Sequence, residues 1–442
     1  MNAAAVDAFG PIREAMRACA RTAAGFALAT ALLLPQSPAA ARAGEPAPPQ
    51  SSAGRARKPG PLRALFTARR PDPATDSPDN LAYMRLVTVG AQVKTETDES
   101  GVPFYVVEWN GGDAGLEHLA SLAGLRWLDA SRTPVSDAGL ALIAPLTGLR
   151  ILKLEQTKIT DRGLIHLRGL TQLEGLALHD NRITPAGIEQ LKDLRQLKYL
   201  NLSWTKSGDE GLARLTGLAQ LEHLYLFDAK ITDAGLPQLA QFPRLKTLKL
   251  SWNPIHDGAL LHLRSLAELE GIWLDWTAVG NAGLRHLQAL PNLRALYLAD
   301  TQVTDHGMIE LAIMPKLEVL DLSNVDVSDA GLWHLRGCRQ LQSLSLDGTN
   351  VTAAGLVHLE GLSGLRELSL SGVDVTDAAL VHLTALHNLV ELNLSETRLT
   401  DQGVEHLKKI RRLERIHLRG SRLSSTALAE LQAARPNLVI QR

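Results

Sequence analysis

The sequence predicts an α/β fold, a curved solenoid with a parallel β-sheet along its concave side and short helices along its convex side. Three observations lead to this prediction. Leucine recurs with a period of 24 residues over most of the chain. Within each period, leucines that alternate as in a strand precede leucines at helical spacing. The composition, 45% hydrophobic and 21% charged residues with a formal net charge of −1, is sufficient for a large core.

The period runs through thirteen consecutive units, which fill residues 125–437. Self-similarity of this kind indicates a repeat architecture, in which each unit packs only on its neighbours. A partial unit precedes residue 125, and Leu438 follows the last unit one residue late. The leading leucines are Leu125, Leu149, Leu173, Leu197, Leu221, Leu245, Leu269, Leu293, Leu317, Leu341, Leu365, Leu389 and Leu413.

One unit, residues 149–172, shows how the spacing predicts the elements. Leu152 and Leu154, at positions four and six, alternate with variable residues, which predicts a strand with one buried face. The ninth residue, Thr157, turns the chain, and its hydroxyl can satisfy a backbone group freed by the turn. Variable positions three, five and seven then point into the concavity, and position eight lies at its rim.

The second half of the unit predicts a short helix. Thr160 and Asp161 offer an N-cap, and leucines follow at helical spacing. We expect capping to explain the aspartate that recurs at this position, and Gly163 and its equivalents to permit close packing between neighbouring helices. A single unit cannot bury its leucines alone, so stacking of units creates the core.

These units resemble the leucine-rich repeat family, whose pattern is LxxLxLxx(N/C)xL. The resemblance covers residues 104–440. Within the family, the units are similar to the bacterial 24-residue TDxGLxxL type. They are also similar to the repeats of F-box adaptors, although no F-box-like segment precedes the repeats. The departure is at position nine, which is usually threonine and is asparagine only at Asn181 and Asn253. The resemblance implies a horseshoe of about 13 repeats with an N-terminal β cap.

Both ends of the repeat array need covering. We predict an N-terminal β cap and partial repeat over residues 81–124, with strands at Leu86–Val89 and Phe104–Val107 around the turn 98–101. A terminal strand is predicted over residues 438–442. It is a thin cap, which leaves end-to-end dimerisation open, but a monomer is the simpler prediction.

The first 80 residues differ in composition from the rest. Residues 1–43 hold Arg13, Arg17 and Arg21, an apolar run over 23–34 and a small-residue site at 41–43, typical of a signal peptide. An uncleaved anchor is the alternative. Residues 44–80 hold eight prolines and several basic residues, which predicts a disordered linker. This linker is either simply solvated or in contact with an anionic surface.

The sequence excludes several function classes. Two cysteines cannot form a disulfide framework, and no nucleotide-binding or catalytic motif stands out. Histidine recurs at one position on the helical side, but a row of identical residues does not converge on a metal. We therefore expect no catalytic residue, no metal and no cofactor. The eight histidines are His118, His166, His262, His286, His334, His358, His382 and His406.

Aromatic residues mark the predicted concave face. Nine of the twelve Trp and Tyr residues fall at positions three, five, seven or eight, and acidic residues such as Asp180 and Asp321 flank them. Clustered exposed rings are typical of a binding surface; the alternative is that they pack along the sheet and shield its backbone. The candidate ligand-binding residues are Trp204, Tyr225, Phe227, Asp228, Lys249, Trp252, Trp273, Asp275, Trp276, Tyr297 and Asp300.

The first hypothesis is therefore an exported, non-enzymatic recognition protein that binds a protein or peptide on this face. Residues 81–442 hold 36 basic and 41 acidic residues, which favours a partner with basic and apolar groups over nucleic acid. The second hypothesis is a carbohydrate-binding module, in which the rings stack on sugars. The third is a hydrolase that uses Asp275 and Asp300 as paired carboxylates. We expect the mature chain not to span a membrane.

Overall fold

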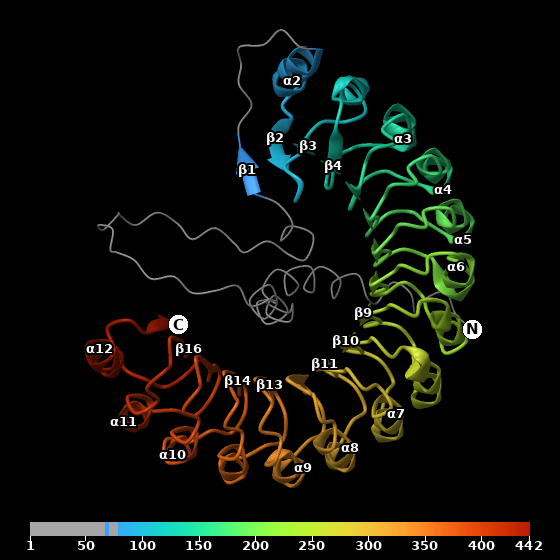
Figure 1. Cartoon of the computed structure of the whole chain (residues 1–442). Coiled ribbons are helices and arrows are strands. Elements are labelled where there is room, and N and C mark those ends of the chain that lie inside the picture. The colour runs from blue at the N-terminus through green and yellow to red at the C-terminus, as the bar shows by residue number, and fades with distance from the viewer. Residues whose placement is uncertain (1–66, 70–77) are drawn as a thin grey trace, which may run out of the picture. The chain divides into compact units, whose positions relative to one another are not determined.

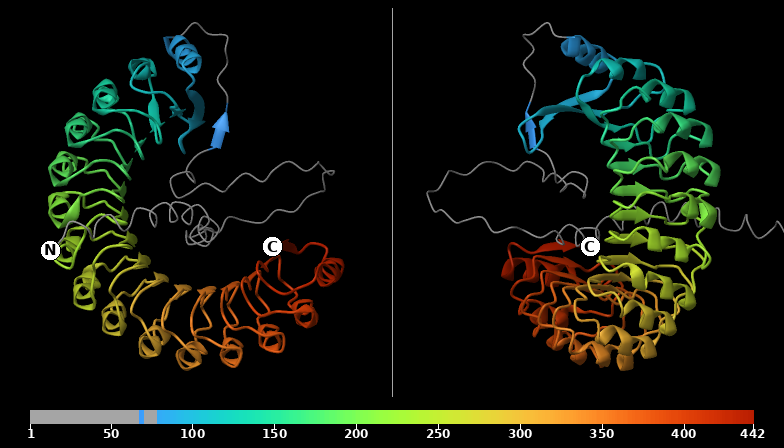
Figure 2. Two further views of the ribbon diagram at one scale, coloured as in Figure 1. Left: turned by 180° about the vertical axis from the view of Figure 1, so that it is seen from behind. Right: turned by 45° about the vertical axis from the view of Figure 1, so that its right-hand side comes forward.

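The computed structural model describes residues 67–69 and 78–442. Contacts divide the chain after Phe66, and the described residues all belong to the second unit, Thr67–Arg442. The predicted signal peptide and most of the predicted linker lie outside the described residues. Within this unit one 17-stranded sheet follows the inside of an arc, and short helices cover its outside (Figures 1 and 2). The predicted solenoid is confirmed.

The strands follow one another in chain order. β1 pairs antiparallel with β2 and β2 antiparallel with β3, and every later pair is parallel. The strands are β1 (Thr67–Arg69), β2 (Gln92–Thr97), β3 (Pro103–Glu108), β4 (Leu125–Asp129), β5 (Ile151–Lys153), β6 (Gly175–Ala177), β7 (Tyr199–Asn201), β8 (His223–Tyr225), β9 (Thr247–Lys249), β10 (Gly271–Trp273), β11 (Ala295–Tyr297), β12 (Val319–Asp321), β13 (Ser343–Ser345), β14 (Glu367–Ser369), β15 (Glu391–Asn393), β16 (Arg415–His417) and β17 (Val439–Gln441).

The convex segments are short α or 3-10 turns, as the few residues between strands require. They are α2 (Pro78–Thr88), η4 (Leu116–Ser121), α3 (Asp137–Ile143), α4 (Asp161–Leu164), η5 (Ile165–Leu167), α5 (Pro185–Ile188), η6 (Glu189–Leu191), α6 (Gly208–Arg214), η7 (Leu236–Gln241), η8 (Asp257–Ser265), α7 (Asn281–Leu287), η9 (Asp305–Gly307), α8 (Met308–Ala312), α9 (Asp329–Leu335), η10 (Gly355–Leu359), α10 (Leu380–Leu383), η11 (Asp401–Gly403), α11 (Val404–Leu407) and α12 (Ser425–Ala434).

The core is a continuous stack of leucines between sheet and helices. In the unit of residues 149–172, Leu152 and Leu154 from the strand half and Leu164 and Leu167 from the helical half have no exposed surface. Their counterparts in the neighbouring units are buried with them in a single cluster. Because the register of adjacent parallel strands is uniform, equivalent positions of successive units form straight rows across the sheet.

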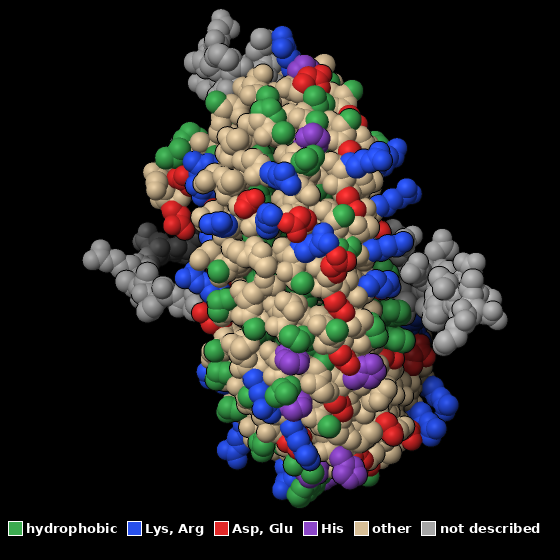
Figure 3. All heavy atoms as spheres, turned by 90° about the vertical axis from the view of Figure 1, so that its right-hand side faces the viewer, with side chains coloured by type: hydrophobic (Ala, Val, Ile, Leu, Met, Phe, Trp, Pro, Cys, Tyr) green, Lys and Arg blue, Asp and Glu red, His purple; other side chains and the backbone are tan. Residues whose placement is uncertain are grey.

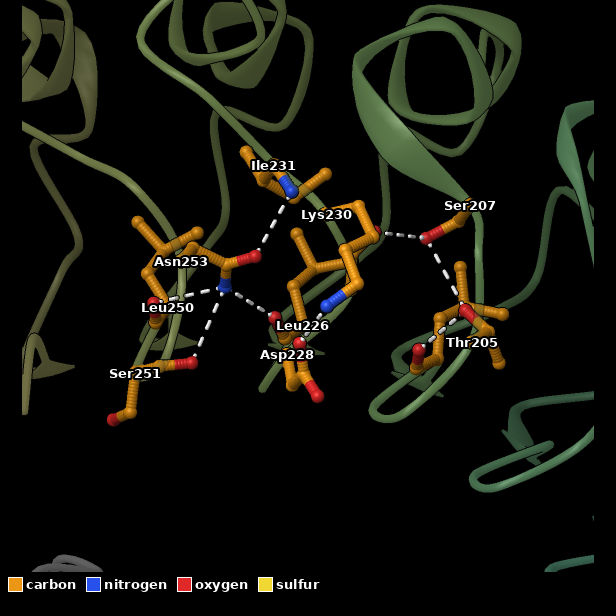
Figure 4. Close-up of polar contacts among 11 residues, drawn as sticks. Thr205, Ser207, Leu226, Asp228, Lys230, Ile231, Leu250, Ser251 and Asn253 are labelled. Atoms are coloured by element: carbon orange, nitrogen blue, oxygen red, sulfur yellow. Dashed lines mark hydrogen bonds and ion pairs between the residues drawn. The ribbon is translucent and has the colours of Figure 1, made fainter. Parts of the chain in front are cut away.

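The turn after each strand depends on position nine, as expected. The hydroxyl of Thr205 donates to the carbonyl of Leu202 at 2.6 Å, a bond that recurs in the other threonine units. Asn253 does more. Its amide donates to the carbonyls of Leu226 and Leu250, at 2.7 and 2.9 Å, and its oxygen accepts from Ile231 N (Figure 4). It thereby serves the preceding unit, whose own ninth residue is an alanine without a donor.

The recurring aspartate has a different role from the predicted one. The cap is the threonine or serine, since Thr160 Oγ1 accepts from Arg162 N at 3.3 Å. The carboxylate of Asp137 instead crosses to the next unit and accepts from Thr160 N and Thr160 Oγ1. The prediction that aspartate caps its own helix was wrong, because the stacking of units brings the next cap residue within reach.

The N-terminal cap also differs from the prediction. Leu86–Val89 is not a strand: residues 78–88 form α2, in which Leu86 is fully buried and Val87 is exposed. Proline at the first helical position favours this start. The predicted turn at 98–101 is present, but it joins β2 to β3. Thr67–Arg69, assigned to the linker, forms the edge strand β1 on β2. At the other end, the predicted terminal strand is β17.

Candidate binding face on the concave sheet

Most of the candidate residues fall into two groups on the concave side, which together span units four to nine. The first, which we call the central row, consists of the third residues of β8 to β12. These residues lie side by side in register across five strands. They are Tyr225, Lys249, Trp273, Tyr297 and Asp321. All five side chains are partly exposed.

The rings of the central row are in direct contact. Trp273 and Tyr297 stack almost parallel, at an interplanar angle of 10° and a centroid distance of 4.5 Å. The ammonium group of Lys249 lies between two rings, 4.6 Å from the centroid of Tyr225 and 4.4 Å from that of Trp273. Both distances are typical of cation–π contacts. Burial lowers the pKa of Lys249 to about 8, and the charge of Asp275 opposes this shift.

The second group, the rim ladder, follows the turn at the end of the strands. Trp204 contacts Phe227 with centroids 5.1 Å apart, and Phe227 lies 6.1 Å from Trp252. Trp252 then stacks on Trp276 at 4.7 Å. Trp276 is 45% exposed, so the ladder presents an open ring at one end.

Position eight has an unusual backbone. It lies in the left-handed region in all thirteen units, with φ between 45° and 72°. Three of these residues are glycines, Gly348, Gly372 and Gly420, which adopt this region without strain. Trp204, Trp252 and Trp276 adopt it with φ of 57°, 63° and 55°. The sequence pattern could not predict the left-handed backbone at position eight, because the leucine period carries no information about the geometry of the turn.

The acidic side chains lie around the central row. Asp275 accepts from Ser251 Oγ at 3.0 Å and from Ala299 N at 3.1 Å. Burial raises the pKa of Asp275 to about 7, and the charge of Asp321 adds to this shift. Burial also raises the pKa of Asp321, against the hydrogen bonds from Ser323. Asp300, which accepts from Asn324 Nδ2, has its pKa raised by burial as well.

Two acidic groups differ from what the sequence suggested. Asp228 is 8% exposed and forms an ion pair with Lys230, so its charge is already compensated (Figure 4). A further acidic group lies in unit ten. Asp347 accepts from Ser369 Oγ at 2.5 Å and from Ser371 N at 2.7 Å, and burial raises its pKa. Asp321 was already expected beside the rings, and a count of acidic residues at position seven would have added Asp347.

The convex side carries a mixed set of side chains (Figure 3). The face drawn in Figure 3 mixes basic, acidic and histidine side chains. The recurring histidines lie in the helical half of their units, where His382 pairs with Glu360. Over the described residues 67–69 and 78–442, no group of three or more His, Cys, Asp or Glu residues is placed to hold a metal ion. In the same part of the chain, no helix combines the length and apolar character needed to cross a bilayer.

Comparison with known proteins agrees with this architecture. An internalin from Listeria monocytogenes matches with a TM-score of 0.53 and 23% identity, over 68% of this chain and 82% of that one. A leucine-rich repeat protein from Leptospira interrogans matches with a TM-score of 0.52 and 19% identity, over 74% and 80%. At these identities the likeness concerns the fold. None of the curated proteins compared with the chain gives a significant match.

Family models give the assignment. A model described as a leucine-rich repeat region matches residues 109–332, which is more than half of the chain. A second model, described as a leucine-rich repeat, matches residues 385–408. The 24-residue units, their ninth-position turns and the parallel sheet are what this family requires. The chain belongs to the leucine-rich repeat family.

Proposed function

We propose that this protein is an exported, non-enzymatic recognition module that binds a protein or peptide on its concave face. The rings of the central row and the rim ladder would supply apolar anchors, and the acidic groups around them would select the partner. The anchors are Trp204, Tyr225, Trp252, Trp273, Trp276 and Tyr297. We expect the module to act as a monomer.

The observation that carries the proposal is the continuous ladder of rings at the rim. Position eight is left-handed in all thirteen units, so this backbone belongs to the repeat turn and does not by itself mark a site. What distinguishes the turns of Trp204, Trp252 and Trp276 is the large ring that each carries there, where three other units have glycine. Phe227 joins these rings into one row of contacts, and Trp276 stays 45% exposed. A continuous, partly exposed row of rings is typical of a binding surface.

The charge of the face supports a partner with basic and apolar groups. Asp275, Asp300 and Asp321 surround the rings, and carboxylates repel phosphate, which argues against nucleic acid. Tryptophan and tyrosine provide large contact areas and lose few rotamers on binding. Both features favour a polypeptide ligand.

Carbohydrate binding is the second candidate, and one observation favours it. Trp252 and Trp276 stack in a strip with Trp276 left 45% exposed, and flat exposed rings are suited to the faces of sugars. The two candidates differ in charge dependence. A sugar would be insensitive to Asp321→Asn, whereas a basic peptide would bind less tightly.

Tryptophan fluorescence tests the face. The purified protein is titrated with defined glycans and with a library of short peptides of varied charge, and the best ligand of either class is then measured against Trp276→Ala. We expect a peptide to bind, and this variant to weaken binding at least tenfold. Trp333→Ala is the matched control, because Trp333 is 44% exposed on the convex helix α9. Equal loss in both variants, or none in Trp276→Ala, would exclude the concave face.

Export rests on residues 1–43, which lie outside the described residues. N-terminal sequencing of the protein from its native host tests it. We expect a chain that begins near Gly44 and is found outside the cytosol. A chain that begins at Met1 and remains in the cytosol contradicts this part of the proposal.

A further inference from the structure

The central row contains a ring and a carboxylate that stand side by side. Tyr297 on β11 pairs in register with Asp321 on β12. Trp273 occupies the other neighbouring place in the row and stacks on Tyr297. Burial raises the pKa of the Tyr297 hydroxyl above its ordinary range, and the charges of Asp321 and Asp275 add to this shift.

Elsewhere in the central row, the ammonium group of Lys249 shows how the row binds a cation. Two strands earlier, the Lys249 ammonium lies over the rings of Tyr225 and Trp273. A ring of this row therefore attracts a positive charge placed by the neighbouring strand. At Tyr297 the neighbouring strand supplies Asp321 instead, so the ring stands beside a negative charge rather than beside an ammonium group.

The acidic groups here lack the direct ion pair that a similar group elsewhere possesses, although the charge of Asp275 also acts on the Lys249 ammonium. Across the described part of the chain, the side chains of Asp275, Asp321 and Asp347 take part in no ion pair, and their hydrogen bonds come from serines and backbone amides. Asp129, at the same repeat position as Asp321, lies 3.4 Å from Lys153. An uncompensated, partly buried charge is costly, and a ligand cation would offset that cost.

Arginine fits this place better than lysine. A guanidinium group is planar, stacks on flat rings and forms parallel N–H···O bonds to a carboxylate. We propose that Tyr297, Asp321 and Asp275 form a subsite for the guanidinium group of an arginine side chain in the polypeptide partner. The subsite deepens the proposed function and rests on it, because it names the group that the concave face selects.

The test uses the full chain and a minimal probe. The peptide acetyl-Gly-Arg-Gly-amide is titrated while Trp fluorescence and ligand NMR signals are recorded. Its citrulline counterpart keeps the shape and removes the charge. We expect the citrulline peptide to bind at least tenfold more weakly, and the lysine counterpart to bind with intermediate affinity. Equal affinities for the arginine and citrulline peptides would overturn the proposal without relying on any variant.

Variants then show where on the face the arginine peptide binds. Asp321→Asn should weaken arginine binding at least fivefold, whereas Asp129→Asn should change it less than twofold. Tyr297→Leu should weaken it at least threefold, and Tyr297→Phe, which retains the ring, should restore it. Circular dichroism confirms that each variant is folded. Equal weakening by Asp321→Asn and Asp129→Asn would mean general attraction by negative charge, and would also overturn the subsite.

Failure of the subsite is distinct from failure of the proposed function. If Trp276→Ala abolishes binding of the peptide ligand while the arginine and citrulline probes bind alike, the face binds its partner but the guanidinium subsite is wrong. If the arginine probe is preferred and the preference is lost in Asp321→Asn, the subsite holds even where the rim ladder is not required.

Discussion

Asp137 accepts two hydrogen bonds from Thr160 of the next unit, from the backbone N at 2.8 Å and from Oγ1 at 2.6 Å. The same pair of bonds joins Asp161 to Thr184 and Asp329 to Thr352. Because the threonine also caps its own helix, each carboxylate fixes the start of the following convex segment. The chain thus links successive units through a polar ladder outside the leucine core.

This ladder crowds the glycine that most units hold at the position of Gly163, where Ala259, Ala379 and Ala427 are the exceptions. A Cβ added to Gly163 would overlap the carboxylate of Asp137 and would lie 3.0 Å from Leu140 Cδ1. We predict that Gly163→Ala lowers the free energy of unfolding by about 2 kcal/mol, the usual scale for overpacking. Urea unfolding followed by circular dichroism measures this change.

Gly169→Ala is the matched control for that substitution. A Cβ there meets nothing within 4 Å, so stability should be unchanged or rise by about 0.5 kcal/mol. In a double-mutant cycle, Gly163→Ala should cost less in the Asp137→Ala background, because the obstructing carboxylate is gone. Equal costs in both backgrounds would contradict the steric explanation.

The ninth-position residues should differ in how much they contribute to the free energy of unfolding. Asn253→Ala leaves the carbonyls of Leu226 and Leu250 and the amide of Ile231 without their partner. We predict a loss of about 3 kcal/mol, whereas Thr277→Ala, which removes one bond to Leu274, should cost about 1 kcal/mol. Unfolding midpoints of the two variants give the comparison, and a larger effect of Thr277→Ala would contradict it.

Strain at position eight can be measured directly. Glu396→Gly, at φ 55° and away from the aromatic groups, should stabilise the protein by about 1 kcal/mol. Trp252→Gly relieves the same strain but loses ring contacts worth a similar amount, so its stability should change little. Its ligand affinity should nevertheless fall at least tenfold. If Trp252→Gly instead unfolds the protein, the ladder is structural and does not serve as a binding surface.

The pH dependence of stability should reveal the raised pKa of Asp275. Its pKa of about 7 in the folded state exceeds the ordinary 3.8, so between about pH 4 and pH 7 the folded state holds a proton that the unfolded chain has released. The contribution of Asp275 to the free energy of unfolding therefore falls as pH rises through this window and is constant above it. We predict that Asp275→Asn gains stability relative to wild type as pH rises from 4.5 to 7.5. A difference independent of pH would contradict the raised pKa.

Much of the architecture could be predicted from the sequence because it depends on one-dimensional periodicity. The leucine period places Leu152 and its equivalents in the core, and uniform register follows from uniform length. Thr157 and Asn253 as turn residues, and Thr160 as a cap, follow from local hydrogen-bonding preferences. In the N-terminal cap the strand predicted at Phe104–Val107 lies within β3, but the strand predicted at Leu86–Val89 was wrong, because that segment lies before the period begins.

By itself the sequence determined the repeat, the buried leucines and which positions face the concavity, since each depends only on spacing within a unit. Only the tertiary structure decided the contacts between units. It set Lys249 between two rings, left Asp321 without an ion pair among the described residues, and directed Asp137 to Thr160. The physical reason is that these partners are about one repeat apart, and their separation depends on how the units stack.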